Sequence, residues 1–174
     1  LKVEYEVVNN DEKRMPFGFA LHPYFPSDEE TLIRVGAKHV MEADEELLPS
    51  GKLMDVTNTW FDLRKPRLVR GLDLDHVFTD LDPENPAYIE YPENNMRIYL
   101  TSSSDLTHVV VYTRAPGKHF CCIENQSGST DMINLYSRAV KEKDELLKTA
   151  AHLLILEPGY RHRGFINYAV EYLT

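Results

Sequence analysis

The sequence predicts an all-β fold, an antiparallel β-sandwich, from two observations. Short apolar runs recur along the whole chain, and Pro, Gly, Asn and Asp residues separate them. Residues 1–7 (LKVEYEV) alternate apolar and charged side chains, which is the period of a strand with one buried face. Many short strands at regular spacing are typical of sandwiches and barrels.

The elements follow in order along the chain. Asn9, Asn10 and Asp11 end the first strand in a turn. Further strands are expected at Thr31–Gly36, His76–Thr79, Ala87–Tyr91, Met96–Thr101, His108–Arg114, Phe120–Glu124, Leu153–Leu156 and Phe165–Leu173. Hairpin loops are expected at Pro92–Asn95 and Ala115–Lys118. One helix is expected over Tyr136–Ala151, where good helix formers dominate. No linker or repeat interrupts the chain, so residues 1–174 are interpreted as one domain.

Composition narrows the class of partner. The chain has 174 residues and a net charge of -9, which argues against nucleic acid and anionic membranes as partners, since both require basic patches. The two cysteines, Cys121 and Cys122, are adjacent in an expected strand. Their side chains should point to opposite faces, so they are poor partners for a disulfide. This favours a reducing, cytoplasmic setting.

Two segments far apart in the sequence carry groups suited to acid–base chemistry. Pro23 restricts His22 to an extended backbone. Glu124 interrupts the apolar run of Phe120–Glu124, so its carboxylate is expected to be partly buried. A histidine and a buried carboxylate are the groups most often used for proton transfer near neutral pH.

Five segments, spanning nearly the whole chain, occur in an order typical of one family. They are His22–Phe25 (HPYF), Leu48–Gly51 followed by Phe61–Arg64, Leu74–Phe78 (LDHVF), Cys122–Gln126 followed by Asp131–Asn134, and Leu156–Gly159. Together they resemble the aldose 1-epimerase (galactose mutarotase) family.

The resemblance implies a large antiparallel sandwich, often called a supersandwich, and an isomerase of carbohydrate metabolism. The implied reaction interconverts the α and β anomers of a free aldose by opening and closing the sugar ring. It implies that His22 is the general acid, that Glu124 is the general base and that Asp75 holds sugar hydroxyls. No cofactor and no metal are implied. The anomeric hydroxyl loses a proton while the ring oxygen gains one, so we expect the base and the acid on separate sides of the sugar.

The family's earlier portion, with further substrate-contacting residues, has no counterpart here. We therefore expect this chain to be the C-terminal part of a longer protein that lacks the N-terminal strands of the fold. An exposed sheet edge is a liability, so the strand Leu1–Val8 is expected to pair with a later strand or with a partner chain. The partner would be a second copy or the missing N-terminal segment.

Other functions remain open at this point. A mutarotase for hexose 6-phosphates would need a basic pocket, for which the candidates are Arg34, Arg64, Arg67 and Arg70. A relative that binds carbohydrate without turnover is a second alternative. A glycoside hydrolase could use Asp75 and Glu124 as its carboxylate pair, but it would leave the His22 segment unexplained.

The remaining histidines and aromatic residues are interpreted as structural. His39, His76, His108, His119, His152 and His162 are expected to pack or to lie on the surface. A sugar could stack on Tyr24, Phe25, Trp60 or Phe78, although core packing is the commoner role of such rings. A metal site built from His22, Asp75 and Glu124 has no short ligand spacing to support it, so no metal is expected.

Overall fold

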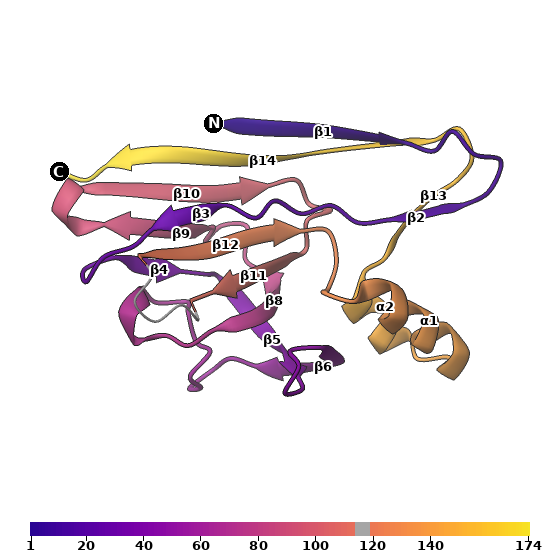
Figure 1. The fold of residues 1–174 in the computed structure, drawn as a ribbon, viewed down its shortest axis with the longest axis horizontal. Coiled ribbons are helices and arrows are strands. Elements are labelled where there is room, and N and C mark those ends of the chain that lie inside the picture. The colour runs from indigo at the N-terminus through magenta and orange to yellow at the C-terminus, as the bar shows by residue number, and fades with distance from the viewer. Residues whose placement is uncertain (114–118) are drawn as a thin grey trace.

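Two antiparallel sheets of six strands each form the body of the protein in a computed structural model that describes residues 1–113 and 119–174 (Figure 1). The predicted antiparallel sandwich is confirmed. The expected loop Ala115–Lys118 and the end of the expected strand at Arg114 lie outside the described residues.

The first sheet has the strand order β1-β14-β10-β9-β4-β7. Its strands are β1 (Lys2–Val8), β14 (Arg161–Tyr172), β10 (Met96–Ser102), β9 (Ala87–Tyr91), β4 (Leu32–Arg34) and β7 (Arg67–Leu68). Strands β9 and β10 form the expected hairpin, in which the 3-10 turn η2 (Pro92–Asn94) makes the loop. A second 3-10 turn, η1 (Val69–Gly71), follows β7.

The second sheet has the order β3-β12-β11-β8-β5-β6. Its strands are β3 (Tyr24–Pro26), β12 (Phe120–Gln126), β11 (His108–Tyr112), β8 (Asp75–Leu81), β5 (Ala37–Ala43) and β6 (Pro49–Asp55). The short pair β2 (Met15–Phe17) and β13 (Leu154–Leu156) forms a separate two-stranded sheet. The sequence did not predict β2, β3, β5, β6 or β7. Strands of two or three residues, such as β2, β3 and β7, are too short to show a period, and the sequences of β5 (AKHVMEA) and β6 (PSGKLMD) do not alternate strictly between apolar and polar residues.

Apolar side chains from the facing sides of the two sheets make the main core. The largest fully buried members include Ile33, Val40, Phe78, Ile89, Leu100 and Ile123. Burying each such side chain stabilises the fold by about 1.5–3 kcal/mol relative to an exposed position. Because alternate residues of β12 face this core, the intervening ones face the other side of the second sheet.

A pair of helices covers part of that other side, and here the sequence prediction was wrong. The single expected helix is two helices, α1 (Met132–Glu142) and α2 (Glu145–Ala151), which lie side by side in Figure 1. Lys143 adopts a left-handed backbone, and the Asp144 carboxylate accepts a hydrogen bond from the Leu147 backbone N–H at 2.9 Å. A side-chain cap of this kind starts a new helix.

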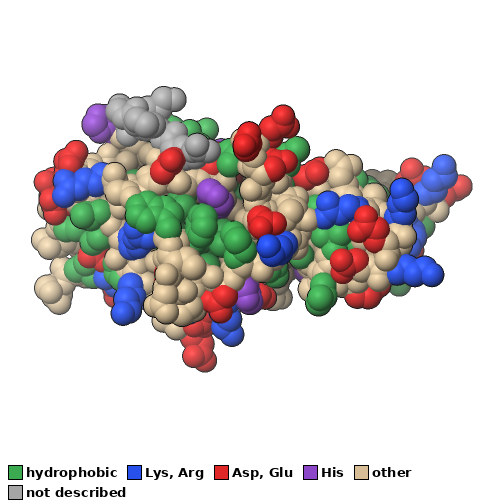
Figure 2. Space-filling view, turned by 90° about the horizontal axis from the view of Figure 1, so that it is seen from below, with side chains coloured by type: hydrophobic (Ala, Val, Ile, Leu, Met, Phe, Trp, Pro, Cys, Tyr) green, Lys and Arg blue, Asp and Glu red, His purple; other side chains and the backbone are tan. Residues whose placement is uncertain are grey.

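The strand β1 pairs antiparallel with β14, from Lys2 opposite Asn167 to Val8 opposite Arg161. The expectation that the first strand pairs with a later one is therefore confirmed. On the face shown in Figure 2, acidic and basic side chains are interspersed around hydrophobic groups. Within the described ranges, no helix combines the length and the apolar character needed to span a lipid bilayer.

Gly164 allows the packing between β1 and β14 to be tested. It lies opposite Tyr5, and a Cβ atom at Gly164 would overlap the Tyr5 hydroxyl group and ring. That hydroxyl donates a hydrogen bond to Asp105 at 2.5 Å, and the Tyr5 ring stacks on Phe19. The tyrosine therefore occupies the space that any side chain at Gly164 would need.

We expect Gly164→Ala to destabilise the protein by about 1–3 kcal/mol, the usual range for overpacking, through displacement of the Tyr5 ring. The shift of the urea unfolding midpoint measures this. Gly71→Ala is the matched control, because a Cβ there meets no atom within 4 Å. Gly164→Ala combined with Tyr5→Ala should cost less than the sum of the two single changes; strict additivity would contradict this explanation.

Candidate active site

Strand β12 carries the carboxylate of the candidate site. Cys121 and Ile123 belong to the sandwich core, and strand alternation directs Cys122 and Glu124 to the other face of the sheet. The Glu124 side chain is only 11% exposed. This is the partly buried carboxylate that the sequence predicted.

The register between β12 and the segment that precedes β3 brings the histidine to this carboxylate. Tyr24 pairs with Cys122, and the isolated bridge of Ala20 pairs with Gln126. The same antiparallel register, continued between these two pairs, places His22 directly opposite Glu124. The Leu21 backbone N–H also donates to the Asn125 carbonyl at 3.4 Å. The extended backbone that Pro23 imposes is thus part of a cross-strand pairing.

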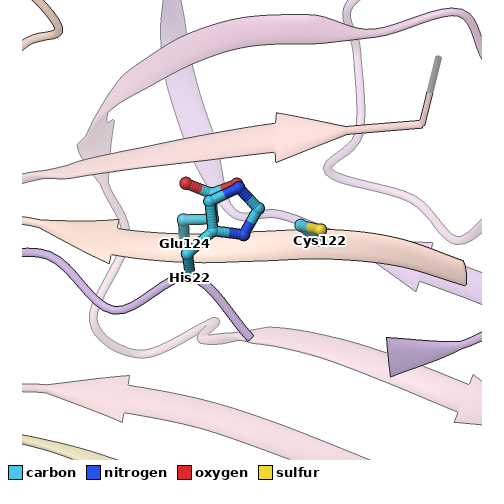
Figure 3. Close-up of side chains that lie close together, drawn as sticks. All are labelled: His22, Cys122 and Glu124. Carbon is cyan, nitrogen blue, oxygen red and sulfur yellow. The ribbon is translucent and has the colours of Figure 1, made fainter. Parts of the chain in front are cut away.

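His22 and Glu124 contact each other directly. His22 Nε2 lies 3.2 Å from Glu124 Oε1, and Figure 3 shows the imidazole ring beside the carboxylate on β12. The His22 side chain is 53% exposed, so the pair is open to solvent on the histidine side. The ring stacks on Tyr24 with centroids 4.8 Å apart and planes within 9°, so the two rings lie face to face.

Asp75, the third predicted site residue, lies on the same face of the sheet. It pairs with Tyr112 on β11, and Tyr112 pairs with Cys122 on β12. Residues paired across strands share a face, and so do residues two apart on one strand. Asp75 is therefore two strands away from β12, and it is aligned across the sheet with Cys122, the neighbour of Glu124 on the same face. His76 points the other way and its ring contacts Phe61, as expected for a structural residue.

Burial and neighbouring charge alter the acid–base properties of this face. Burial raises the pKa of Glu124, the His22 ring acts to lower it, and the negative charge of Asp75 raises it further. Burial, followed by the charges of Glu124 and Asp75, raises the pKa of the Cys122 thiol to about 12. The Glu124 carboxylate is therefore a stronger base than an exposed glutamate.

The sequence did not identify Cys122 as a neighbour of these groups. The sequence predicted only that Cys121 and Cys122 point to opposite faces, and the proximity of Cys122 to His22 follows from the pairing of β3 with β12. The available signal was the two-residue spacing of Cys122 and Glu124, which places both on one face of a strand. Of the candidate stacking rings, Phe25 and Phe78 are buried in the core, whereas Tyr24 lies exposed beside His22.

Other histidines and the candidate arginines have contacts of their own. The buried His108 lies 3.1 Å from the Ala150 carbonyl, and burial lowers its pKa to about 4. Arg64 pairs with Asp62 at 2.7 Å and Arg70 with Glu29 at 2.5 Å.

A cavity of about 390 Å³ lies on the opposite side of β12 from Glu124. Its walls include Ser102, Val109 and Asn125, and Asn125 follows Glu124 on the strand. Strand alternation therefore separates this cavity from the His22–Glu124 pair. We place the candidate active site at the His22–Glu124 pair, which lies on the face of the second sheet that points away from the sandwich core.

Comparison with known proteins agrees with this architecture. The crystal structure of a protein from Escherichia coli K12, proposed to be an aldose 1-epimerase, superposes with a TM-score of 0.79 at 21% identity, over 99% of this chain and 56% of that one. A galactose mutarotase-like protein from Clostridium acetobutylicum gives 0.78 at 19% identity, over 99% and 52%. Galactose 1-epimerase from Lactobacillus acidophilus gives 0.70 at 19% identity, over 99% and 54%.

These likenesses show a shared fold, and the chain spans little more than half the length of each of the three proteins. The family profile described as aldose 1-epimerase matches residues 1–168, which is nearly the whole chain. The resemblance of the five sequence segments is thereby confirmed, and the chain belongs to the aldose 1-epimerase family.

Proposed function

We propose that this protein is a mutarotase that interconverts the α and β anomers of a free aldose. Ring opening removes the proton of the anomeric hydroxyl and delivers a proton to the ring oxygen; closure on the other face of the carbonyl gives the other anomer. Both oxygens are bonded to the same carbon. A base and an acid that act on them must therefore lie within a few ångström of each other.

The observation that carries this proposal is the contact between His22 and Glu124. Glu124, with its raised pKa, accepts the proton of the anomeric hydroxyl, and the His22 imidazolium donates to the ring oxygen. The two side chains touch in the free protein, whereas we expected them on separate sides of a sugar. Substrate must enter between them, and the exposure of His22 leaves its ring room to move.

Neighbouring residues fit a substrate that is rich in hydroxyl groups. We assign Asp75 to hold sugar hydroxyls, because charge-assisted hydrogen bonds are the stronger ones. The exposed ring of Tyr24 beside His22 can cover an apolar face of the sugar. Two of the four candidate arginines, Arg64 and Arg70, are engaged by carboxylates, whereas Arg34 and Arg67 lie over the rings of Tyr88 and Trp60. We propose an uncharged aldose as the substrate, and the comparison with a hexose 6-phosphate below tests this choice.

Polarimetry on freshly dissolved α-glucose and α-galactose tests the proposal. The purified protein should accelerate the approach to the equilibrium rotation for at least one sugar of a panel of free aldoses. Glucose should be a better substrate than glucose 6-phosphate. If no sugar of the panel equilibrates faster than in buffer, the proposal is wrong; sugar binding by calorimetry without such acceleration would instead indicate a binding protein.

Asp75→Asn should shift the pH dependence of the reaction as well as weaken sugar binding. The negative charge of Asp75 raises the pKa of Glu124, so its removal lowers that pKa. Because the base acts in its deprotonated form, the acidic limb of the kcat/KM profile should move to lower pH. Loss of a hydrogen bond from a charged group should raise KM by roughly ten- to a hundredfold.

The exposed Glu45→Gln is the matched control for loss of one negative charge. This variant should change neither the pH of the acidic limb of the kcat/KM profile nor the value of KM. An acidic limb that stays fixed in Asp75→Asn would contradict an influence of Asp75 on the base.

A further inference from the structure

Three side chains with different donor atoms meet at the candidate active site. The ligating atoms of His22, Cys122 and Glu124 all lie within 4.8 Å of one another. Figure 3 shows the three side chains on one side of β12, with Cys122 next to the His22–Glu124 pair. They offer a ring nitrogen, a sulfur and a carboxylate oxygen.

The pairing of the strands explains why these three groups meet. Cys122 and Glu124 are two residues apart on β12, so they share a face, and the cross-strand register sets His22 opposite Glu124. The set includes a thiol that the sequence-based candidate of His22, Asp75 and Glu124 did not contain. Strand β12 positions two of the donors, and the extended segment before β3 supplies the third.

The donor set matches the preferences of zinc. Zn²⁺ binds imidazole nitrogen, thiolate sulfur and carboxylate oxygen at about 2.0–2.3 Å, so two ligands of one tetrahedral ion stand roughly 3.5 Å apart. The His22–Glu124 separation of 3.2 Å is already of that size. The widest separation in the group is within 4.8 Å, so closing around an ion requires side-chain movements of about an ångström.

We propose that His22, Cys122 and Glu124 form a binding site for a thiophilic divalent cation of the zinc type. On binding, the Cys122 S–H bond breaks, a bond between sulfur and metal forms, and the proton passes to solvent. The half-exposed His22 leaves the fourth coordination position toward solvent, where water can bind. Three protein ligands with an open position are a common zinc arrangement.

The cation should also inhibit the protein. Coordination occupies the His22 nitrogen and the Glu124 oxygen that proton transfer to and from the sugar requires. Zn²⁺ and sugar should therefore compete for the same groups. This consequence rests on the proposed mutarotase function, whereas metal binding itself does not.

Cobalt spectroscopy tests the site without any assay of activity. Co²⁺ added to the reduced, purified protein should bind one ion per chain and produce a thiolate-to-cobalt charge-transfer band. Zn²⁺ should abolish that band by displacement, and competition with a chromophoric chelator gives the zinc affinity. Second-layer residues alone typically change metal affinity 10- to 100-fold, so Cys122→Ala should weaken zinc binding by at least about 100-fold and remove the band.

Cys121→Ala is the matched control, because Cys121 is equally buried but faces the sandwich core. It should keep the band and the affinity. His22→Asn provides a second variant at an exposed position, so it should fold even if Cys122→Ala does not, and it should also weaken zinc binding. Absence of the band from the parent protein, or its persistence in Cys122→Ala, would overturn the proposal.

Inhibition is then measured against the metal-free rate of each variant. In the parent, added Zn²⁺ should lower the rate, and rising sugar concentration should relieve the effect; zinc insensitivity of an active parent would overturn the inhibitory role. If the protein shows no mutarotase activity at all, the proposed function fails, while the cobalt spectra still decide the metal site.

Discussion

Replacing Glu124 with glutamine is expected to lower kcat for anomer exchange by about 10²–10⁴-fold, the usual contribution of one positioned proton transfer. Glutamine keeps the shape and the hydrogen-bonding capacity of the side chain but cannot accept the proton of the anomeric hydroxyl. Sugar affinity should change little. Polarimetry for kcat and calorimetry for binding separate the two effects.

Stability provides an internal check on this variant. Burial raises the pKa of Glu124, so the charge on this side chain opposes folding. The contribution of the Glu124 side chain to the free energy of unfolding is greatest below its pKa in the unfolded chain, where the carboxyl is protonated. This contribution is lost as the pH rises through its pKa in the folded protein. At neutral pH, Glu124→Gln should therefore melt at the same temperature as the parent or higher, and a loss of activity cannot be assigned to unfolding.

The matched control is Glu4→Gln, which changes an exposed strand carboxylate on the other sheet. It should retain parental kcat. A Glu124→Gln protein with near-parental kcat on its best sugar would overturn the assignment of the base, while the fold would stand.

His22→Asn should also depress kcat by about 10²–10⁴-fold, because asparagine cannot supply the proton for the ring oxygen. Polarimetry over a range of pH measures the loss. His39→Asn is the matched control: His39 also contacts a carboxylate, Asp80 at 2.5 Å, on the same sheet. That variant should keep the parental profile.

Combining His22→Asn with Glu124→Gln should cost much less than the product of the two single losses. In the proposed mechanism, acid and base act in one passage through the transition state, so once either is missing the other contributes little. Polarimetric rates of the parent, the two single variants and the double variant complete the comparison. Fully multiplicative losses would mean that the two groups act in separate steps.

Local signals in the sequence were enough for the fold class and for most strands. The alternation in residues 1–7 indicates a strand with one buried face and does not depend on which strand it pairs with. The turn at Asn95 is predicted from the backbone preferences of Asn95 and its neighbours alone. The predicted helix boundaries were wrong because helix propensity alone does not show where a helix is interrupted. Favourable helix propensity runs through Tyr136–Ala151, whereas the break at Lys143 and Asp144 is made by one side-chain cap.

By itself, the sequence determined the antiparallel β class, the family and the identity of His22, Asp75 and Glu124 as candidates, because periodicity and short segments are properties of neighbouring residues. Only the tertiary structure decided that His22 lies opposite Glu124 and that Cys122 joins them. These contacts depend on the register between segments about a hundred residues apart. A shift of one residue in that register would turn the side chains of one strand to the other face, and no local pattern specifies which pairing wins.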